Sequence, residues 1–450
     1  KGKTKSVYYD QNSVFMSSLD YTYYKDKHNL RAIFVSTIKD FLPHKGRFTI
    51  KINGVEATDF TLKNVSNTGK SVDINFEREL SPMDVIDVSY KISAKNTCVR
   101  KSVIAGAYYD SEEFTRAYNY EGNDLGVTFD NLDHPNKTTF KVWTPVSSKV
   151  VLKIYNSSDY RTDLTPTETH EMTKGDKGVF SITLNGDYEG RYYTYEVHNI
   201  AGVNEVCDPY TKACGLNGRR GLVINFKKFN QELSGWAQDT RPNFGDNATD
   251  AIISEIHVRD MTINPNSGVS ETNRGRFLGL TEEGTTYSEG GTTVSTGLDH
   301  LKELGVTHVQ IQPMYDYASV DETTLDNTYG EDNYNWGYDP LNYNCLEGSY
   351  STNPVDGYKR IIEAKKMIMA LHKAGISINM DVVYNHTSGF INSNFQLLVP
   401  NYYYRTSNSG VASNGSGCGN EMASERYMVN KFFRESCKFW VDEYHIDGFR

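Results

Sequence analysis

Cysteine is scarce in this sequence: six cysteines are scattered through 450 residues, and none belongs to a CxxC pair. This pattern matches neither a zinc site nor a dense disulfide framework. We therefore expect reduced thiols, which slightly favours the cytoplasm over secretion. The first residues, Lys1 to Thr4, begin without Met and lead into no apolar segment, so we expect any targeting signal to be absent from this sequence or already removed.

Long hydrophobic runs and an excess of basic residues are also lacking. Apolar runs such as 251–253 and 380–384 are far shorter than the roughly 20 residues that cross a bilayer. Lys and Arg total 47 against 57 Asp and Glu, and the net charge of -10 offers no general attraction for phosphate backbones or anionic lipids. We therefore predict no membrane span and no nucleic-acid partner. At ~150 residues per domain, the length predicts about three folded domains.

Several catalytic motifs are missing, whereas tyrosine is abundant. There is no HExxH, no GxSxG and no GxGxxG before a helix, which disfavours a metalloprotease, a serine hydrolase or a dehydrogenase. The sequence has 32 Tyr, 20 Phe and 4 Trp, or 12% aromatic residues. Aromatic rings suit sugar binding because C–H bonds of a sugar pack on the ring face. Aromatic-rich β-sandwich cores explain the same composition, and this alternative stays open.

The first half of the sequence shows short alternating runs that are broken by turn signals. Residues 1–105 contain such runs at 47–52 and 72–76, and residues 106–236 contain them at 139–143, 149–155 and 191–197. We predict two β-sandwich domains in series, neither with a helix of more than a turn or two. The first is an accessory domain for which carbohydrate binding is one candidate role.

The pattern changes after residue 236, where β-like runs alternate with amphipathic helical patterns. Strands are predicted at 251–258, 308–314 and 377–384, with another opening at Ile446. Gly375 occupies the position that follows a helix. Two helical faces are predicted, one from Tyr358, Ile361, Ile362, Ile368 and Met369, and one from Phe433, Cys437, Trp440, Val441 and Tyr444.

Repeated βα units without a glycine-rich nucleotide fingerprint favour a (β/α)₈ barrel over a doubly wound sheet. The sequence reaches only the fourth strand at Arg450. We therefore predict that residues 237–450 form the N-terminal part of a catalytic (β/α)₈ TIM barrel.

The third predicted strand of the barrel ends in a polar segment that contains Asp381, Asn385 and His386. In such a barrel the carboxyl ends of the strands point into the active site, so these side chains are expected at its mouth. Asn385 is a candidate oxygen ligand for calcium. Taken alone, a strand followed by a polar turn explains the segment equally well.

Two further segments carry candidate site residues. Arg450 closes the segment 447–450, where it is placed to hold a neighbouring carboxylate ionised; a structural salt bridge is the alternative. The heptapeptide YNWGYDP, residues 334–340, lies in a long loop that puts Trp336 and Tyr338 where a flat ligand can stack. A buried loop anchor is the competing interpretation.

Together, and in this order, these segments resemble glycoside hydrolase family 13, the α-amylase family. Residues 381–386 are similar to its first signature region and residues 447–450 to the start of its second, and YNWGYDP resembles the signature of type I pullulanases, its debranching members. The resemblance runs from about residue 106 to the end, and it includes segments 124–126, 140–145, 279–285 and 348–354.

The resemblance implies a carbohydrate-binding module 48 at 106–236 and hydrolysis of α-1,6-glucosidic bonds with retention. The implied substrates are the α-glucans pullulan, amylopectin and limit dextrins. The family pattern places the nucleophilic Asp two positions after Arg450, and the acid/base Glu also lies beyond residue 450. The 450 residues alone are therefore expected to be inactive. The alternatives are a non-catalytic α-glucan-binding fragment, an isoamylase and a branching enzyme.

By the same resemblance, the residues present here orient the substrate. Tyr338 stacks under the sugar, with Trp336 nearby, and His386 hydrogen-bonds sugar hydroxyls in the transition state. Arg450 keeps the nucleophile ionised.

The remaining implied roles support that orientation. Asp339 fixes the heptapeptide loop, while Asp381 and Asn385 hold the chain around His386. No cofactor is required, and calcium at Asn385 is an optional addition.

Overall fold

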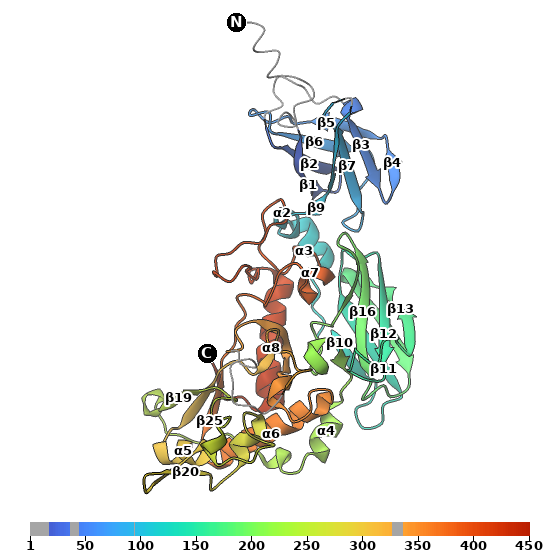
Figure 1. The fold of residues 1–450 in the computed structure, drawn as a ribbon. Coiled ribbons are helices and arrows are strands. Elements are labelled where there is room, and N and C mark those ends of the chain that lie inside the picture. The colour runs from blue at the N-terminus through green and yellow to red at the C-terminus, as the bar shows by residue number, and fades with distance from the viewer. Residues whose placement is uncertain (1–17, 37–44, 94, 326–335) are drawn as a thin grey trace, which may run out of the picture.

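The computed structural model describes residues 18–36, 45–93, 95–325 and 336–450. Figure 1 shows a first β-sandwich at one end of the molecule, with a second sandwich and an α/β region lying alongside each other below it. No helix in these described ranges is both long and apolar enough to cross a membrane.

The first sandwich consists of two sheets whose strands are mostly antiparallel. One has the strand order β5-β6-β2-β1-β9 and the other β4-β3-β7-β8. Alternate residues Phe48, Ile50 and Ile52 of β3 face the core, as the pleat of a half-buried strand requires. The predicted runs 47–52 and 72–76 correspond to β3 and β6. The strands are β1 (Leu19–Asp26), β2 (Asn29–Phe34), β3 (Phe48–Ile52), β4 (Val55–Ala57), β5 (Phe60–Lys63), β6 (Ser71–Phe76), β7 (Ile86–Lys91), β8 (Thr97–Lys101) and β9 (Val103–Ile104).

The second sandwich pairs a sheet of order β10-β11-β15-β14 with one of order β13-β12-β16-β17, and β18 also pairs with β16. The rings of Tyr193 and Tyr195 stand 5.6 Å apart in its core, so part of the tyrosine content serves packing. The predicted runs 139–143, 149–155 and 191–197 lie on β11, β12 and β16. The strands are β10 (Gly126–Phe129), β11 (Lys137–Trp143), β12 (Lys149–Tyr155), β13 (Glu168–Glu171), β14 (Thr173–Lys174), β15 (Val179–Asn185), β16 (Tyr192–Asn199), β17 (Gly202–Val206) and β18 (Gly221–Leu222).

Short helices connect these parts. Helices α2 (Gly106–Tyr109) and α3 (Glu112–Tyr118) join the sandwiches, and α4 (Phe226–Glu232) follows the second one. The side chain of Ser111 caps α3 by accepting a hydrogen bond from the Phe114 amide. Each helix has two turns at most, as the sequence predicts.

The α/β region contains a parallel four-stranded sheet, β19-β22-β25-β26. Its strands are β19 (Ile253–Ile256), β22 (His308–Ile311), β25 (Ser377–Met380) and β26 (Gly448–Phe449). Residues Ile256, Ile311 and Met380 are in register and pack toward α5 (Gly297–Leu304), α6 (Gly357–Lys373) and α8 (Tyr427–Tyr444). This is the first half of a (β/α)₈ barrel, as predicted, although each strand is shorter than its predicted run because the chain leaves the ladder to form the loops.

The helix faces were predicted with mixed success. In α6, Ile361 and Ile368 are buried, and Gly375 lies just after the helix with φ +80°. The predicted face of α8 is confirmed at Trp440 and Tyr444, which are buried, but it is wrong at Val441, which is 44% exposed. The buried face also includes Val429, Phe432 and Ser436, which the prediction left out. Ser436 is small and polar, so a pattern of large apolar residues predicted only part of this face.

Candidate active site

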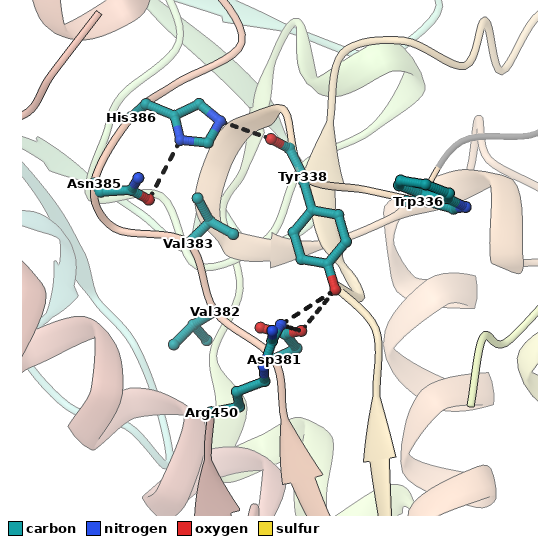
Figure 2. A pocket seen from close by; sticks show the side chains of 8 residues that line it. All are labelled: Trp336, Tyr338, Asp381, Val382, Val383, Asn385, His386 and Arg450. Carbon is teal, nitrogen blue, oxygen red and sulfur yellow. Dashed lines mark hydrogen bonds and ion pairs between the residues drawn. The ribbon is translucent and has the colours of Figure 1, made fainter. Parts of the chain in front are cut away.

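A pocket of about 580 Å³ opens at the carboxyl end of the parallel sheet (Figure 2). It joins the three segments that the sequence singled out: the heptapeptide, the end of the third strand and the end of the fourth. The lining residues are Trp336, Tyr338, Asp381, Val382, Val383, Asn385, His386 and Arg450. Every predicted site residue except Asp339 therefore contributes to one pocket.

Asp381 is the centre of the polar contacts in this pocket. Its amide continues the sheet by donating to the carbonyl of Ile311 (3.0 Å), and the amide of Arg450 donates to Met380 (3.0 Å). These backbone bonds bring the side chains of two neighbouring strands together. The buried Asp381 carboxylate accepts hydrogen bonds from the Tyr338 hydroxyl (2.8 Å) and from Nη1 of Arg450 (2.5 Å).

The electrostatics keep this set in defined charge states. Burial, followed by the neighbouring Asp381 carboxylate, raises the pKa of Tyr338 to about 12, so the phenol stays a neutral donor. The hydrogen bond that Arg450 donates to the Asp381 carboxylate raises the pKa of Arg450 above its ordinary value. The Arg450 side chain is still 56% exposed, so its other nitrogens remain open to a ligand.

His386 is held by the heptapeptide and by its own neighbour. Its Nε2 lies 2.8 Å from the Tyr338 carbonyl oxygen, and its Nδ1 lies 3.3 Å from Oδ1 of Asn385 (Figure 2). Because a carbonyl only accepts, Nε2 carries the proton of this bond. The buried Tyr343 hydroxyl donates to the His386 carbonyl (2.6 Å) and fixes the backbone there.

The described part of the heptapeptide begins at Trp336, while Tyr334 and Asn335 lie outside the described residues. Trp336 is 61% exposed at the rim, which rules out a buried anchor for this side chain. Gly337 has φ +84°, and a Cβ there would lie 2.9 Å from the carbonyl oxygen of Pro313. Burial raises the pKa of Asp339, whose backbone carbonyl accepts from the Ala318 amide (3.2 Å).

Comparison with known proteins gives the same picture. Residues 124–211 match carbohydrate-binding module 48 (isoamylase N-terminal domain), and residues 285–404 match the α-amylase catalytic domain. The pullulanase of Bacillus subtilis (strain 168) is 38% identical over 359 residues, which cover 78% of this chain and 46% of that protein. Over these stretches the chain is similar to the α-amylase family, glycoside hydrolase family 13.

Solved structures of this family extend the similarity. A pullulanase from Paenibacillus barengoltzii, in complex with maltohexaose and α-cyclodextrin, has a TM-score of 0.69 at 44% identity over 76% of this chain and 50% of that one. A pullulanase from Anoxybacillus sp. LM18-11, complexed with maltotetraose, has a TM-score of 0.74 at 35% identity over 96% and 57%. The chain thus spans about half the length of the α-amylase-family proteins it matches.

The geometry around Asn385 does not fit a calcium site. Its side-chain oxygen faces His386, and its carbonyl accepts from the Met422 amide (2.9 Å). Among the described residues, the group of close acidic side chains able to hold an ion lies elsewhere, at Asp316, Glu322 and Glu347. The residues present around Asn385 therefore do not fit calcium.

That acidic group already has a cation from the protein. The buried Arg360 guanidinium lies 3.1 Å from Glu322 and 3.7 Å from Asp316. The backbone amide of Asn217, from the second sandwich, donates to Glu322 (2.6 Å). Burial raises the pKa of Asp316 well above its usual range. The group lies where the second sandwich meets the barrel, and sequence patterns gave no sign of it.

A second network missed by the sequence lies at the amino end of the sheet. His372 donates to Asp239 (2.9 Å) from Nδ1 and to Asp447 (3.0 Å) from Nε2, and the His372 side chain is only 2% exposed. Although burial alone would lower it, these two carboxylates raise the pKa of His372 to about 9. Hydrogen bonds from His372 and His445 lower the pKa of Asp239 to about 2 despite its burial.

Proposed function

We propose that this chain is the substrate-orienting part of a debranching enzyme that hydrolyses α-1,6-glucosidic bonds of pullulan, amylopectin and limit dextrins with retention. One observation carries the proposal: Tyr338, from the pullulanase-like heptapeptide, shares a pocket and a hydrogen bond with Asp381, from the first α-amylase signature. The maltooligosaccharides in the structures of related pullulanases support an α-glucan as the ligand.

The pocket offers the groups that orient a sugar. An aromatic ring at Tyr338 and an exposed one at Trp336 provide stacking faces, and Arg450 and His386 provide polar contacts. Retaining hydrolysis also needs two carboxyl groups ≈ 5–5.5 Å apart, one as nucleophile and one as acid/base. In the described pocket lining the single carboxylate is Asp381, which is already bound to Tyr338 and Arg450. We assign the nucleophile and the acid/base to residues that follow Arg450, and expect the 450 residues alone to be inactive.

Product analysis tests the linkage specificity. The full-length protein that contains this chain is incubated with pullulan, and the products are separated by chromatography. Maltotriose as the sole product supports α-1,6 hydrolysis. Panose-type products would mean α-1,4 cleavage and would contradict the proposal.

A second candidate function is α-glucan binding without catalysis, favoured by the single carboxylate in the described pocket. Affinity electrophoresis of the 450-residue chain in gels with and without pullulan tests it. Retardation that Tyr338→Ala abolishes places the glucan in the pocket, whereas retardation that survives the substitution places it on the sandwiches. A chain that migrates equally in both gels binds no pullulan.

The contacts of Asn385 disfavour the optional calcium site, so we expect the unfolding temperature to be the same with and without a chelator. A cytoplasmic location remains a prediction. All six cysteines are free thiols, which supports that location. Cell fractionation is its test.

A further inference from the structure

The segment that follows His386 lies against the second sandwich. Helix α7 (Asn394–Leu398) is the contact element, and Figure 1 shows it next to that sandwich. Nδ2 of Asn199 donates to the carbonyl of Leu397 (2.8 Å), and Oγ1 of Thr144 donates to the carbonyl of Leu398 (2.7 Å). Both donor side chains are buried, so water cannot replace these bonds without opening the interface.

The apolar contacts across this interface form one continuous core. Trp143 of the sandwich packs edge-on against Tyr402, with ring centroids 4.8 Å apart, and against Tyr403 at 6.2 Å. Val146 of the sandwich and Leu398 of α7 belong to the same buried cluster. The sandwich is therefore part of the surface on which residues 386–404 fold.

A chain of hydrogen bonds leads from α7 back to the pocket. Ser393 caps α7 by accepting from the Gln396 amide (3.1 Å), and it also accepts from the Tyr404 hydroxyl (2.7 Å). That hydroxyl lies 2.6 Å from Oγ1 of Thr387, the residue directly after His386. Asn420 binds both the amide and the carbonyl of Thr387 (2.9 and 2.8 Å).

We propose that Thr144 and Asn199 of the second sandwich are positioning residues for His386. They hold the end of α7, and the Ser393–Tyr404–Thr387 contacts carry that constraint to the pocket. The second sandwich would then act on the reaction by positioning His386, independently of any sugar binding of its own. The kinetic part of this inference rests on the proposed function, whereas its structural part does not.

Hydrogen exchange followed by mass spectrometry tests the structural part on the full-length protein without substrate. Thr144→Val removes the hydroxyl at constant shape, and Asn199→Asp replaces the donor while keeping the oxygen that accepts from Ala201 (2.9 Å). We expect about tenfold faster exchange of peptides covering 386–404, as the loss of one buried hydrogen bond implies. Thr144→Ser restores the hydroxyl and should restore slow exchange.

The matched control is Thr138→Val. Thr138 is also a buried threonine of β11, and its hydroxyl donates to the Gly186 carbonyl (2.9 Å) within the same sandwich. Its loss weakens the sandwich but should leave 386–404 protected. Unchanged exchange of this segment in Thr144→Val and Asn199→Asp, or equal acceleration in Thr138→Val, would overturn the proposal.

Kinetics on an α-glucan substrate supply the second readout. A shifted His386 should lower kcat about three- to tenfold with little change in KM, because the lost contacts belong to the transition state. Thr144→Ser should again be close to the unchanged protein. If exchange accelerates but kcat does not move, the sandwich holds the segment without positioning His386. A protein with no activity at all would contradict the proposed function instead.

Discussion

The amino end and the carboxyl end of the parallel sheet each carry a buried carboxylate paired with a cation, but the two pairs differ in exposure and in role. At the amino end, which we call the closed end, His372 is enclosed between Asp239 and Asp447. At the carboxyl end, which we call the open end, Arg450 pairs with Asp381, and 56% of the Arg450 side chain remains exposed. Strand β26 connects the two sites, since Asp447 precedes it and Arg450 follows it.

The difference shows what an enclosed ion pair can and cannot do. At the closed end each charge already has its partners, so the network stabilises the fold and has little left to offer a ligand. At the open end the guanidinium keeps free donors beside two aromatic rings. The strongly shifted pKa of His372 therefore belongs to a structural network and does not by itself indicate an active site.

The largest expected effect on stability comes from removing the His372 side chain at the closed end. His372→Leu leaves Asp239 and Asp447 buried, although His445 still contacts the first (2.7 Å) and Arg241 the second (3.3 Å). We expect a loss of about 2–4 kcal/mol in the free energy of unfolding. Urea unfolding measures it, with His386→Leu at the open end as the matched change. The latter should cost about 1–2 kcal/mol, since it removes contacts to neutral groups; equal losses would erase the distinction.

The next effect is a pH dependence of the same network. The pKa of His372 is raised from 6.5 to about 9. Its contribution to the free energy of unfolding is therefore complete below about pH 6.5 and disappears as the pH rises through 9. We expect roughly 2–3 kcal/mol to be lost over that range. The pKa of Asp239 is lowered to about 2, so its contribution is lost only as the pH falls from about 4 through 2. Urea unfolding between pH 5 and 10 shows the first loss, and His372→Leu should flatten it; an equal slope in both proteins would argue against the network.

At the open end, Tyr338→Ala should change function more than stability. If the ring stacks on the sugar, its loss should weaken transition-state binding by ~1–3 kcal/mol, a range taken from base–aromatic stacking, and kcat/KM should fall accordingly. Tyr338→Phe is the control, because it keeps the ring and removes only the hydroxyl bound to Asp381. Kinetics on pullulan measure both. An unchanged rate for the alanine variant would remove the stacking role.

The smallest effect concerns Trp336. Because its side chain is 61% exposed, Trp336→Ala should change the free energy of unfolding by less than about 0.5 kcal/mol. Glucan affinity, measured by affinity electrophoresis, should nevertheless decrease. Ile391→Ala is the control, another exposed apolar side chain that does not line the pocket. Equal affinities for the two variants would place Trp336 outside the binding surface.

The sequence predicted the pocket better than the networks, for a physical reason. Asp381 and Arg450 end adjacent parallel strands, so topology alone brings them together. The partners of His372 lie 133 and 75 residues away, and no local period links them. Arg360 falls in an amphipathic helix, where a charged residue is expected on the solvent side. Its burial depends on the loops of two other regions, which local patterns do not describe.

The contacts of α7 have a consequence for protein engineering. The carbonyls of Leu397 and Leu398 receive their hydrogen bonds from another domain, and Trp143 shares a core with Tyr402. Exchanging the second sandwich for a homologous module would therefore disturb the packing of residues 386–404, which begin at His386 in the pocket. A functional chimera needs residues 386–404 to be transferred together with the second sandwich, although the two segments are encoded far apart in the gene.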